Sequence, residues 1–171
     1  MITFISHFRG DTEYRYRNLK NVISYYGSLY PDSEHIIIND SAKPDERLKE
    51  LATNRTKFYF FENPSDYRRC ECYNIGIKNA KNEIIVFLDV DVLVSKIQID
   101  TCVKGLIDGI VHFVYPYDGR FVDIVNHELI PDFVSNFNDS IKKYETINLN
   151  TSARISSRIL PAFTGTARGR A

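Results

Sequence analysis

The chain has 171 residues, of which 43% are hydrophobic and 26% charged, a composition typical of a globular domain with a substantial core. Lysine plus arginine and aspartate plus glutamate each number 22, so nothing in the charge favours nucleic acid or an anionic membrane surface as a partner. No stretch approaches the roughly 18 to 20 apolar residues of a membrane span, and the start of the chain lacks the pattern of a secretory signal.

Strand and helix patterns alternate through the first two-thirds of the chain. Short apolar runs predict strands at residues 2–6, 35–38, 58–61 and 84–89, and helical periodicity predicts helices at 16–26, 44–53 and 67–81. Asp11 or Thr12 is expected to cap the first helix and Gly27 to end it. The alternation predicts an α/β fold of the Rossmann type, a three-layer α/β/α sandwich around a mainly parallel sheet.

The remaining third has a less regular pattern. It predicts a helix at 99–107, strands at 110–115 and 120–125 on either side of a turn at 116–119, and a helix at 131–144. His112 lies in an apolar stretch and is interpreted as a core histidine. Because no repeat or linker interrupts the sequence, one domain spanning residues 1–171 is expected.

The spacing of the cysteines indicates in which cellular compartment the protein lies and whether it has a zinc-binding motif. Cys70, Cys72 and Cys102 form no CxxC pair and no zinc-ligand spacing with histidine. Reduced thiols and a cytoplasmic location are therefore expected.

The run Ile84–Asp91 is the most informative stretch of the sequence. Its apolar residues predict a buried parallel strand, and two aspartates, Asp89 and Asp91, follow directly. Open α/β sheets place their ligand sites at the carboxyl ends of strands. Two carboxylates at that point suit one Mg²⁺ or Mn²⁺ ion that also binds phosphate. The segment therefore predicts a metal-bridged diphosphate site.

Further polar residues follow the first two predicted strands. His7 and Arg9 come after the first, and Asp40 after the second. Arginine clamps phosphate, and a carboxylate accepts hydrogen bonds from a nucleobase or from ribose hydroxyls. Together these strand ends predict a nucleotide pocket. Glycine-rich phosphate loops are absent from the sequence, which disfavours a dinucleotide oxidoreductase and a P-loop nucleoside triphosphatase.

The order of these features resembles that of GT-A glycosyltransferases, particularly the family 2-like enzymes that build polysaccharides. The resemblance rests on Asp40 after the second strand, on Tyr73-Asn74-Ile75-Gly76-Ile77 in the third helix and on Phe87-Leu88-Asp89-Val90-Asp91. It covers about residues 1–125 and implies a GT-A fold, with a nucleotide-binding half at 1–91 and a partial acceptor-side half at 92–171.

The resemblance also implies an activity and residue roles. The expected reaction is metal-dependent transfer of a sugar from a nucleoside-diphosphate sugar to a glycan or another hydroxyl acceptor. Asp40 would contact the base, Asp89 the ribose or the metal, and Asp91 the metal, which would be Mn²⁺ or Mg²⁺. The family has an arginine where this chain has Tyr73, so the base or phosphate contact there is expected either to be lost or to become stacking.

No catalytic base can be assigned from the sequence. Candidates by position alone are Asp118, Asp123, His127, Glu128 and Asp132. Because the family places its base well past the aspartate pair, activity of these 171 residues is expected to be weak. A nucleotidyltransferase and a non-catalytic nucleotide-sugar-binding domain are the alternatives. The sequence leaves open the base, the sugar, the acceptor, the stereochemistry and the oligomeric state.

Overall fold

The computed structural model describes residues 1–116, 124 and 126–148. The chain forms two compact units, Met1–Leu93 and Val94–Ala171, and each is described by itself. The expectation of a single domain stays a prediction.

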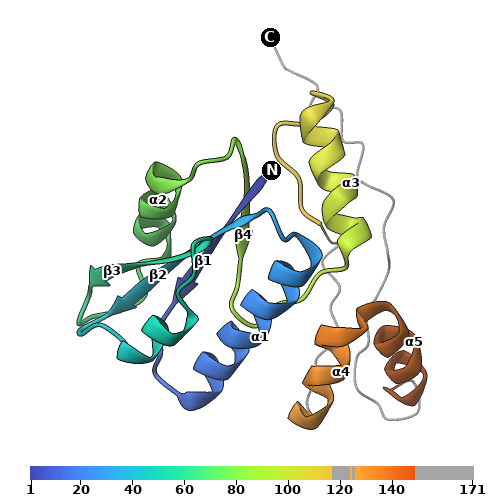
Figure 1. Cartoon of the computed structure of the whole chain (residues 1–171), viewed down its shortest axis with the longest axis horizontal. Coiled ribbons are helices and arrows are strands. Elements are labelled where there is room, and N and C mark those ends of the chain that lie inside the picture. Colours follow the sequence, from blue (N-terminus) through green and yellow to red (C-terminus); the bar gives the residue numbers. More distant parts are fainter. Residues whose placement is uncertain (117–123, 125, 149–171) are drawn as a thin grey trace. The chain divides into compact units, whose positions relative to one another are not determined.

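The first unit is a parallel sheet flanked by helices (Figure 1). Its four strands lie in the order β3-β2-β1-β4, and every neighbouring pair is parallel. This arrangement confirms the predicted α/β fold. Along the chain the elements are β1 (Ile2–Phe8), α1 (Glu13–Leu29), β2 (Glu34–Ser41), the 3₁₀ helix η1 (Glu46–Leu51), β3 (Thr56–Glu62), α2 (Arg69–Asn79) and β4 (Ile84–Leu88).

Helices cover both faces of the sheet, as the three-layer prediction required. Successive residues of a strand point to opposite faces. Ile37 of β2 packs in one core cluster with Leu19 of α1. Its neighbours Ile36 and Ile38 pack in another with Cys72 of α2. The same alternation places His7 of β1 and Asp40 of β2 on the face beneath α2.

Gly76 lets α2 lie close against the sheet. It is buried, and a Cβ atom at this position would lie only 2.4 Å from Cγ2 of the fully buried Ile5. Any larger residue would push α2 away from β1. The glycine therefore sets the distance between α2 and the sheet, and with it how closely side chains of α2, such as Cys72, approach the strands.

All three helices of the first unit differ from their sequence-based bounds, α2 by only two residues at each end. Helix α1 is capped by Thr12, as one of the two alternatives predicted, but it continues through Gly27 to Leu29. Tyr25 and Tyr26 are buried just before the glycine, so packing outweighs its low helix propensity. The helix predicted at 44–53 is instead η1, a 3₁₀ helix that begins after Asp45, whose side chain accepts from the backbone N–H of Arg47.

All the regular secondary structure described in the second unit is helical. Helix α3 begins three residues before its predicted start because Ser95 and Gln98 form a reciprocal capping box. The helix predicted at 131–144 is interrupted at Asn136, whose backbone is not helical (φ −147°, ψ 71°). The elements are α3 (Lys96–Ile107), η2 (His127–Leu129), α4 (Ile130–Ser135) and α5 (Phe137–Asn148).

The strand predicted at 110–115 was wrong. Gly109, at φ 68°, ends α3, and the N–H groups of Ile110 and Val111 then donate back to the carbonyl of Gly105. These N–H groups therefore hydrogen-bond to the last turn of α3 and not to a neighbouring strand. His112 is exposed and is not a core histidine. The strand predicted at 120–125 falls almost entirely outside the described residues.

Burial of His35 makes stability depend on pH. Its Nε2 atom has no hydrogen-bond partner among the described residues, and burial lowers the pKa of His35 to about 4. Between this value and the ordinary 6.5, the unfolded chain binds the extra proton, so stability falls as pH falls. From pH 7 to pH 5 we expect His35 to account for a loss of about 2 kcal/mol.

Denaturant unfolding of the wild type and of His35→Phe at both pH values measures this loss. The phenylalanine fits beside Phe4, whose ring centroid is 4.9 Å from that of His35. The variant is expected to lose less stability over this pH range. Equal losses in the two proteins would show that His35 is not the group responsible.

Candidate functional site

Asp89 and Asp91 lie in a turn that directly follows β4, at its carboxyl end, as predicted. Val90 between them is 1% exposed and packs in the core cluster that also contains Leu19. The hydroxyl of Tyr26 donates to the carbonyl oxygen of Val92 at 3.3 Å. Because the turn is anchored through Val90 and Val92, both carboxylates remain on the exposed surface beside it.

The first turns of α2 border the aspartate pair. Nη2 of Arg69 lies 3.4 Å from Oδ1 of Asp89. One helical turn later, the ring of Tyr73 packs on that of Phe87 with centroids 4.6 Å apart. Burial, and then the charge of Asp89, raise the pKa of Tyr73, so its hydroxyl stays protonated. Sequence reasoning selected Tyr73 but missed Arg69, although the two are spaced i, i+4 on one helix face.

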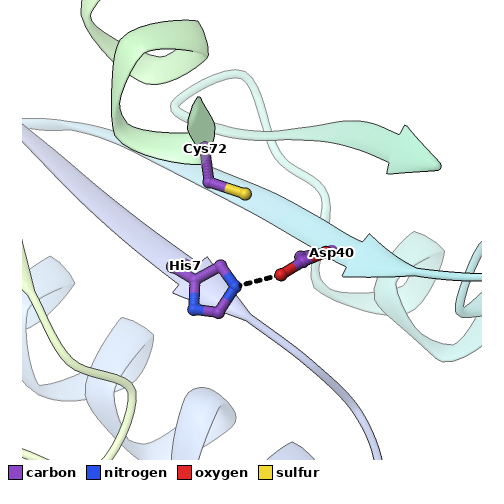
Figure 2. Close-up of side chains that lie close together, drawn as sticks. All are labelled: His7, Asp40 and Cys72. Atoms are coloured by element: carbon purple, nitrogen blue, oxygen red, sulfur yellow. Dashed lines mark hydrogen bonds and ion pairs between the residues drawn. The ribbon is translucent and has the colours of Figure 1, made fainter. Parts of the chain in front are cut away.

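His7 and Asp40 form a buried pair beneath α2 (Figure 2). His7 Nε2 is 2.6 Å from Asp40 Oδ2, and Asp40 is completely buried. Asn63 donates to Asp40 Oδ1 at 2.7 Å, and the backbone N–H of Arg68 donates to Oδ2 at 3.3 Å. Burial opposes ionisation of Asp40, but these hydrogen bonds outweigh it and hold the pKa of the carboxyl below its usual value. The carboxylate of Asp40 thus already accepts hydrogen bonds from the protein, whereas the sequence predicted that it would be free to contact a nucleotide.

Cys72 completes a cluster with this pair. One ligand atom each from His7, Asp40 and Cys72 lies within 4.8 Å of the other two, and all three residues are buried. Figure 2 shows the thiol over the gap between the imidazole and the carboxylate. Burial, followed by the charges of Asp40 and Glu71, raises the pKa of the Cys72 thiol to about 12. No spacing pattern could have found this cluster, because its members come from three separate elements.

Arg9 lies just past β1 and is held by its neighbours. Its guanidinium donates to the carbonyl of Ser65 and lies 3.3 Å from a carboxylate oxygen of Asp11. It also lies over the ring of Tyr67, 5.4 Å from the centroid. A phosphate would therefore have to compete with these partners for Arg9. Tyr67 also packs edge-on against His7 and was not selected from the sequence.

The sheet order brings the predicted site residues to neighbouring strand ends within the first unit. Strand β1 lies between β2 and β4. His7 and Asp40 lie within the last residues of β1 and β2, not after these strands as predicted, and only the aspartate pair follows its strand, β4. A hollow of about 490 Å³ lies elsewhere, beside η1 and β3. Of the candidate bases, Asp118 and Asp123 fall outside the described residues, as does the side chain of His127. Glu128 and Asp132 are exposed in the second unit.

Comparison with known proteins gives a family. The family model for glycosyl transferase family 2 matches residues 10–160. The chain belongs to glycosyl transferase family 2. This finding confirms the resemblance seen in the sequence. No curated protein matches the chain.

Two solved structures are also similar to this family 2 chain. They are S. aureus TarS and residues 1–349 of S. aureus TarS, each with 16% identity and a TM-score of 0.47 over 63% of this chain. The matches cover 19% and 32% of those chains, so the present chain spans about a third or less of their length.

The motif residues of this family 2 chain lie in its first unit. Asn74 and Gly76 are on α2, and Phe87-Leu88-Asp89-Val90-Asp91 spans the end of β4 and its turn. Within the described part of the chain, no helix has the length and apolar character needed to cross a membrane.

Proposed function

We propose that the chain binds a nucleoside-diphosphate sugar and takes part in transferring the sugar to a glycan or another hydroxyl acceptor. The observation that supports this most directly is the exposed pair Asp89 and Asp91 at the carboxyl end of β4, in a chain of glycosyl transferase family 2. Ligands of open parallel sheets bind outside this end of the strands. A cytoplasmic location fits a soluble nucleotide donor and is part of the proposal.

The two aspartates fit Mg²⁺ or Mn²⁺. Both are exposed carboxylates, and such ions bind through one or two carboxylates while keeping water and phosphate oxygens as their other ligands. Bound there, the ion would stabilise the negative charge of the departing nucleoside diphosphate. Asp91 would be a protein ligand of the ion. Asp89 would share the ion or accept from the ribose through Oδ2, since Arg69 lies beside its Oδ1.

The remaining predicted contacts are assigned to the nucleotide. Tyr73 would stack on the nucleotide with the ring face that Phe87 does not cover. Arg9 would exchange the carbonyl of Ser65 for a phosphate oxygen. His7 would orient Asp40 through their hydrogen bond. Since Asn63 covers Oδ1 of Asp40, a base would reach this carboxylate by replacing the amide of Asn63.

An inverting transfer also needs a general base near the acceptor hydroxyl. No residue is assigned to that role. Slow hydrolysis of the donor requires only departure of the diphosphate, and water can then replace the acceptor. Donor hydrolysis is therefore the reaction by which we would detect activity in this chain.

The proposal is tested by titrating nucleoside diphosphates into the purified chain by calorimetry, with Mn²⁺, with Mg²⁺ and with chelator. We expect at least one nucleoside diphosphate to bind more tightly with metal. Incubation with the corresponding sugar nucleotides is then expected to release free sugar slowly. Equal affinity with metal and with chelator would overturn the metal assignment. Binding without sugar release would identify a non-catalytic nucleotide-sugar-binding domain, and release of pyrophosphate from a nucleoside triphosphate and sugar phosphate a nucleotidyltransferase.

A further inference from the structure

A second group of metal-ligand side chains lies beneath α2. His7 of β1, Asp40 of β2 and Cys72 of α2 form the only group of three or more such residues found in the part of the chain that the structure describes. They are 4%, 0% and 0% exposed. The group differs in chemistry from Asp89 and Asp91, which offer carboxylate oxygens at the surface.

We propose that His7, Asp40 and Cys72 bind one Zn²⁺ ion that ties β1, β2 and α2 together. Imidazole, thiolate and carboxylate are the ligands that zinc takes in proteins. Mg²⁺ and Mn²⁺ prefer oxygen ligands, so the buried cluster and the exposed aspartates would select different ions. The inference goes beyond the proposed function and does not rest on it.

The charges of the ligands match a divalent ion. An uncompensated charge is costly to bury, and the cluster lies in the interior. The carboxylate of Asp40 and the thiolate of Cys72 supply two negative charges, while neutral His7 supplies none. A bound Zn²⁺ ion would therefore form a site without net charge. By contrast, Mn²⁺ at Asp89 and Asp91 is expected to remain partly hydrated, where water shares its charge.

Binding exchanges protons for the ion. The Cys72 thiol loses its proton to solvent as the sulfur–zinc bond forms. The imidazole of His7 binds zinc through the lone pair of Nε2, so any proton on Nε2 moves to Nδ1 or to solvent. The His7–Asp40 hydrogen bond, 2.6 Å between its heavy atoms, is replaced by two bonds to zinc, and in the zinc-bound chain the ion orients Asp40 in place of that hydrogen bond. The proton of the Cys72 thiol is released for each ion bound, and one coordination position remains for water.

The surroundings already hold the ligands in place. Asn63 donates to Asp40 Oδ1 at 2.7 Å, while Oδ2 faces His7 and also accepts from the backbone N–H of Arg68 at 3.3 Å. Hydrogen bonds of this kind to a ligating carboxylate orient metal ligands in known sites. Gly76, one turn after Cys72, keeps α2 at the distance from β1 that the cluster needs. Oδ1 of Asp40 would remain the atom that a donor base could approach.

The test uses the whole chain, purified without chelator, and measures zinc by atomic emission. The metal is then removed and the protein titrated with Co²⁺, whose bond to a thiolate gives an absorption band in the near ultraviolet. We expect one zinc per chain, a saturable thiolate band at one Co²⁺ per chain, and a thermal unfolding midpoint several degrees higher with zinc.

Cys70 provides a matched control. It lies on the same helix two residues before Cys72 but is exposed. Cys70→Ala is expected to keep the cobalt band, whereas Cys72→Ala and the size-matched Cys72→Ser are expected to lose it. Circular dichroism checks that each variant is folded. The proposal is overturned if the wild type holds no stoichiometric zinc and gives no thiolate band, a result that needs no variant. It is equally overturned if a folded Cys72 variant keeps the band.

Discussion

Asp91→Ala is expected to remove most of the gain in nucleoside diphosphate affinity that Mn²⁺ or Mg²⁺ provides. The site offers two carboxylates in one turn, and removing one leaves the ion held by Asp89, water and phosphate. We expect a loss of roughly 100-fold in affinity with metal, about 2.7 kcal/mol, and little change with chelator. Calorimetric titration of the wild type and the variant under both conditions measures the difference.

Glu83→Ala is the matched control for the loss of charge. Glu83 is exposed and immediately precedes β4, whereas Asp91 lies beyond the other end of that strand. This variant removes one negative charge from the same unit and is expected to keep the full effect of metal. If Asp91→Ala retained that effect, or if Glu83→Ala lost as much of it, Asp91 would not be the ligand.

Asp40→Ala is expected to destabilise the fold strongly, because Asp40 is the centre of a buried hydrogen-bond network. The substitution leaves His7 and Asn63 without their carboxylate partner in a site shielded from water. Removal of one partner of such a pair costs about 3 to 5 kcal/mol. Denaturant unfolding at pH 7 measures the change.

Asp45→Ala is the control for Asp40→Ala. Asp45 is also ion-paired, through Arg47, but this pair is partly exposed, and the aspartate caps only the short helix η1. A loss of about 1 kcal/mol is expected. If the two variants were equally stable, the buried network would contribute nothing beyond an ordinary surface pair.

The contribution of the Asp40 network to the free energy of unfolding also depends on pH, and the direction follows from the pKa of Asp40. The folded state holds the pKa of Asp40 below the ordinary value of 3.8, so its stabilisation is complete above that value. The stabilisation is lost as the pH falls through the lower folded pKa. The wild type is therefore expected to lose more free energy of unfolding in acid than Asp40→Ala does.

Asp40→Ala is also expected to bind nucleosides more weakly. In the molecules of this variant that remain folded, the binding free energy is expected to weaken by roughly 1 to 3 kcal/mol, with the effect of metal preserved.

The sequence by itself determined the framework of the first unit. Apolar runs and helical periods are local signals, and they placed the four strands, α1 and α2 within a few residues. The position of Asp89 and Asp91 after an apolar strand followed from the same pattern, but the expectation that this strand is buried was wrong, because β4 lies at the edge of the described sheet and is only partly buried. The family resemblance rested on fixed spacings near that strand, and the match to residues 10–160 confirms it.

The pattern failed where a segment's structure depended on a partner that local sequence does not specify. The apolar stretch at 110–115 resembles a strand, but a strand needs a neighbour to accept its backbone hydrogen bonds. Gly109 turns the chain at the end of α3 instead, and the next two N–H groups return to Gly105. Gly27 was misread for a related reason, since buried tyrosines carry α1 past it.

Only the tertiary structure decided how the polar residues are used. His7, Asp40 and Cys72 are far apart in sequence, and they meet because β1, β2 and α2 pack together at the distance that Gly76 allows. The same packing buries the Asp40 carboxylate and brings Arg69 beside Asp89. Sequence patterns report which face a residue occupies, whereas burial and pairing are set by contacts between segments that the chain folds together.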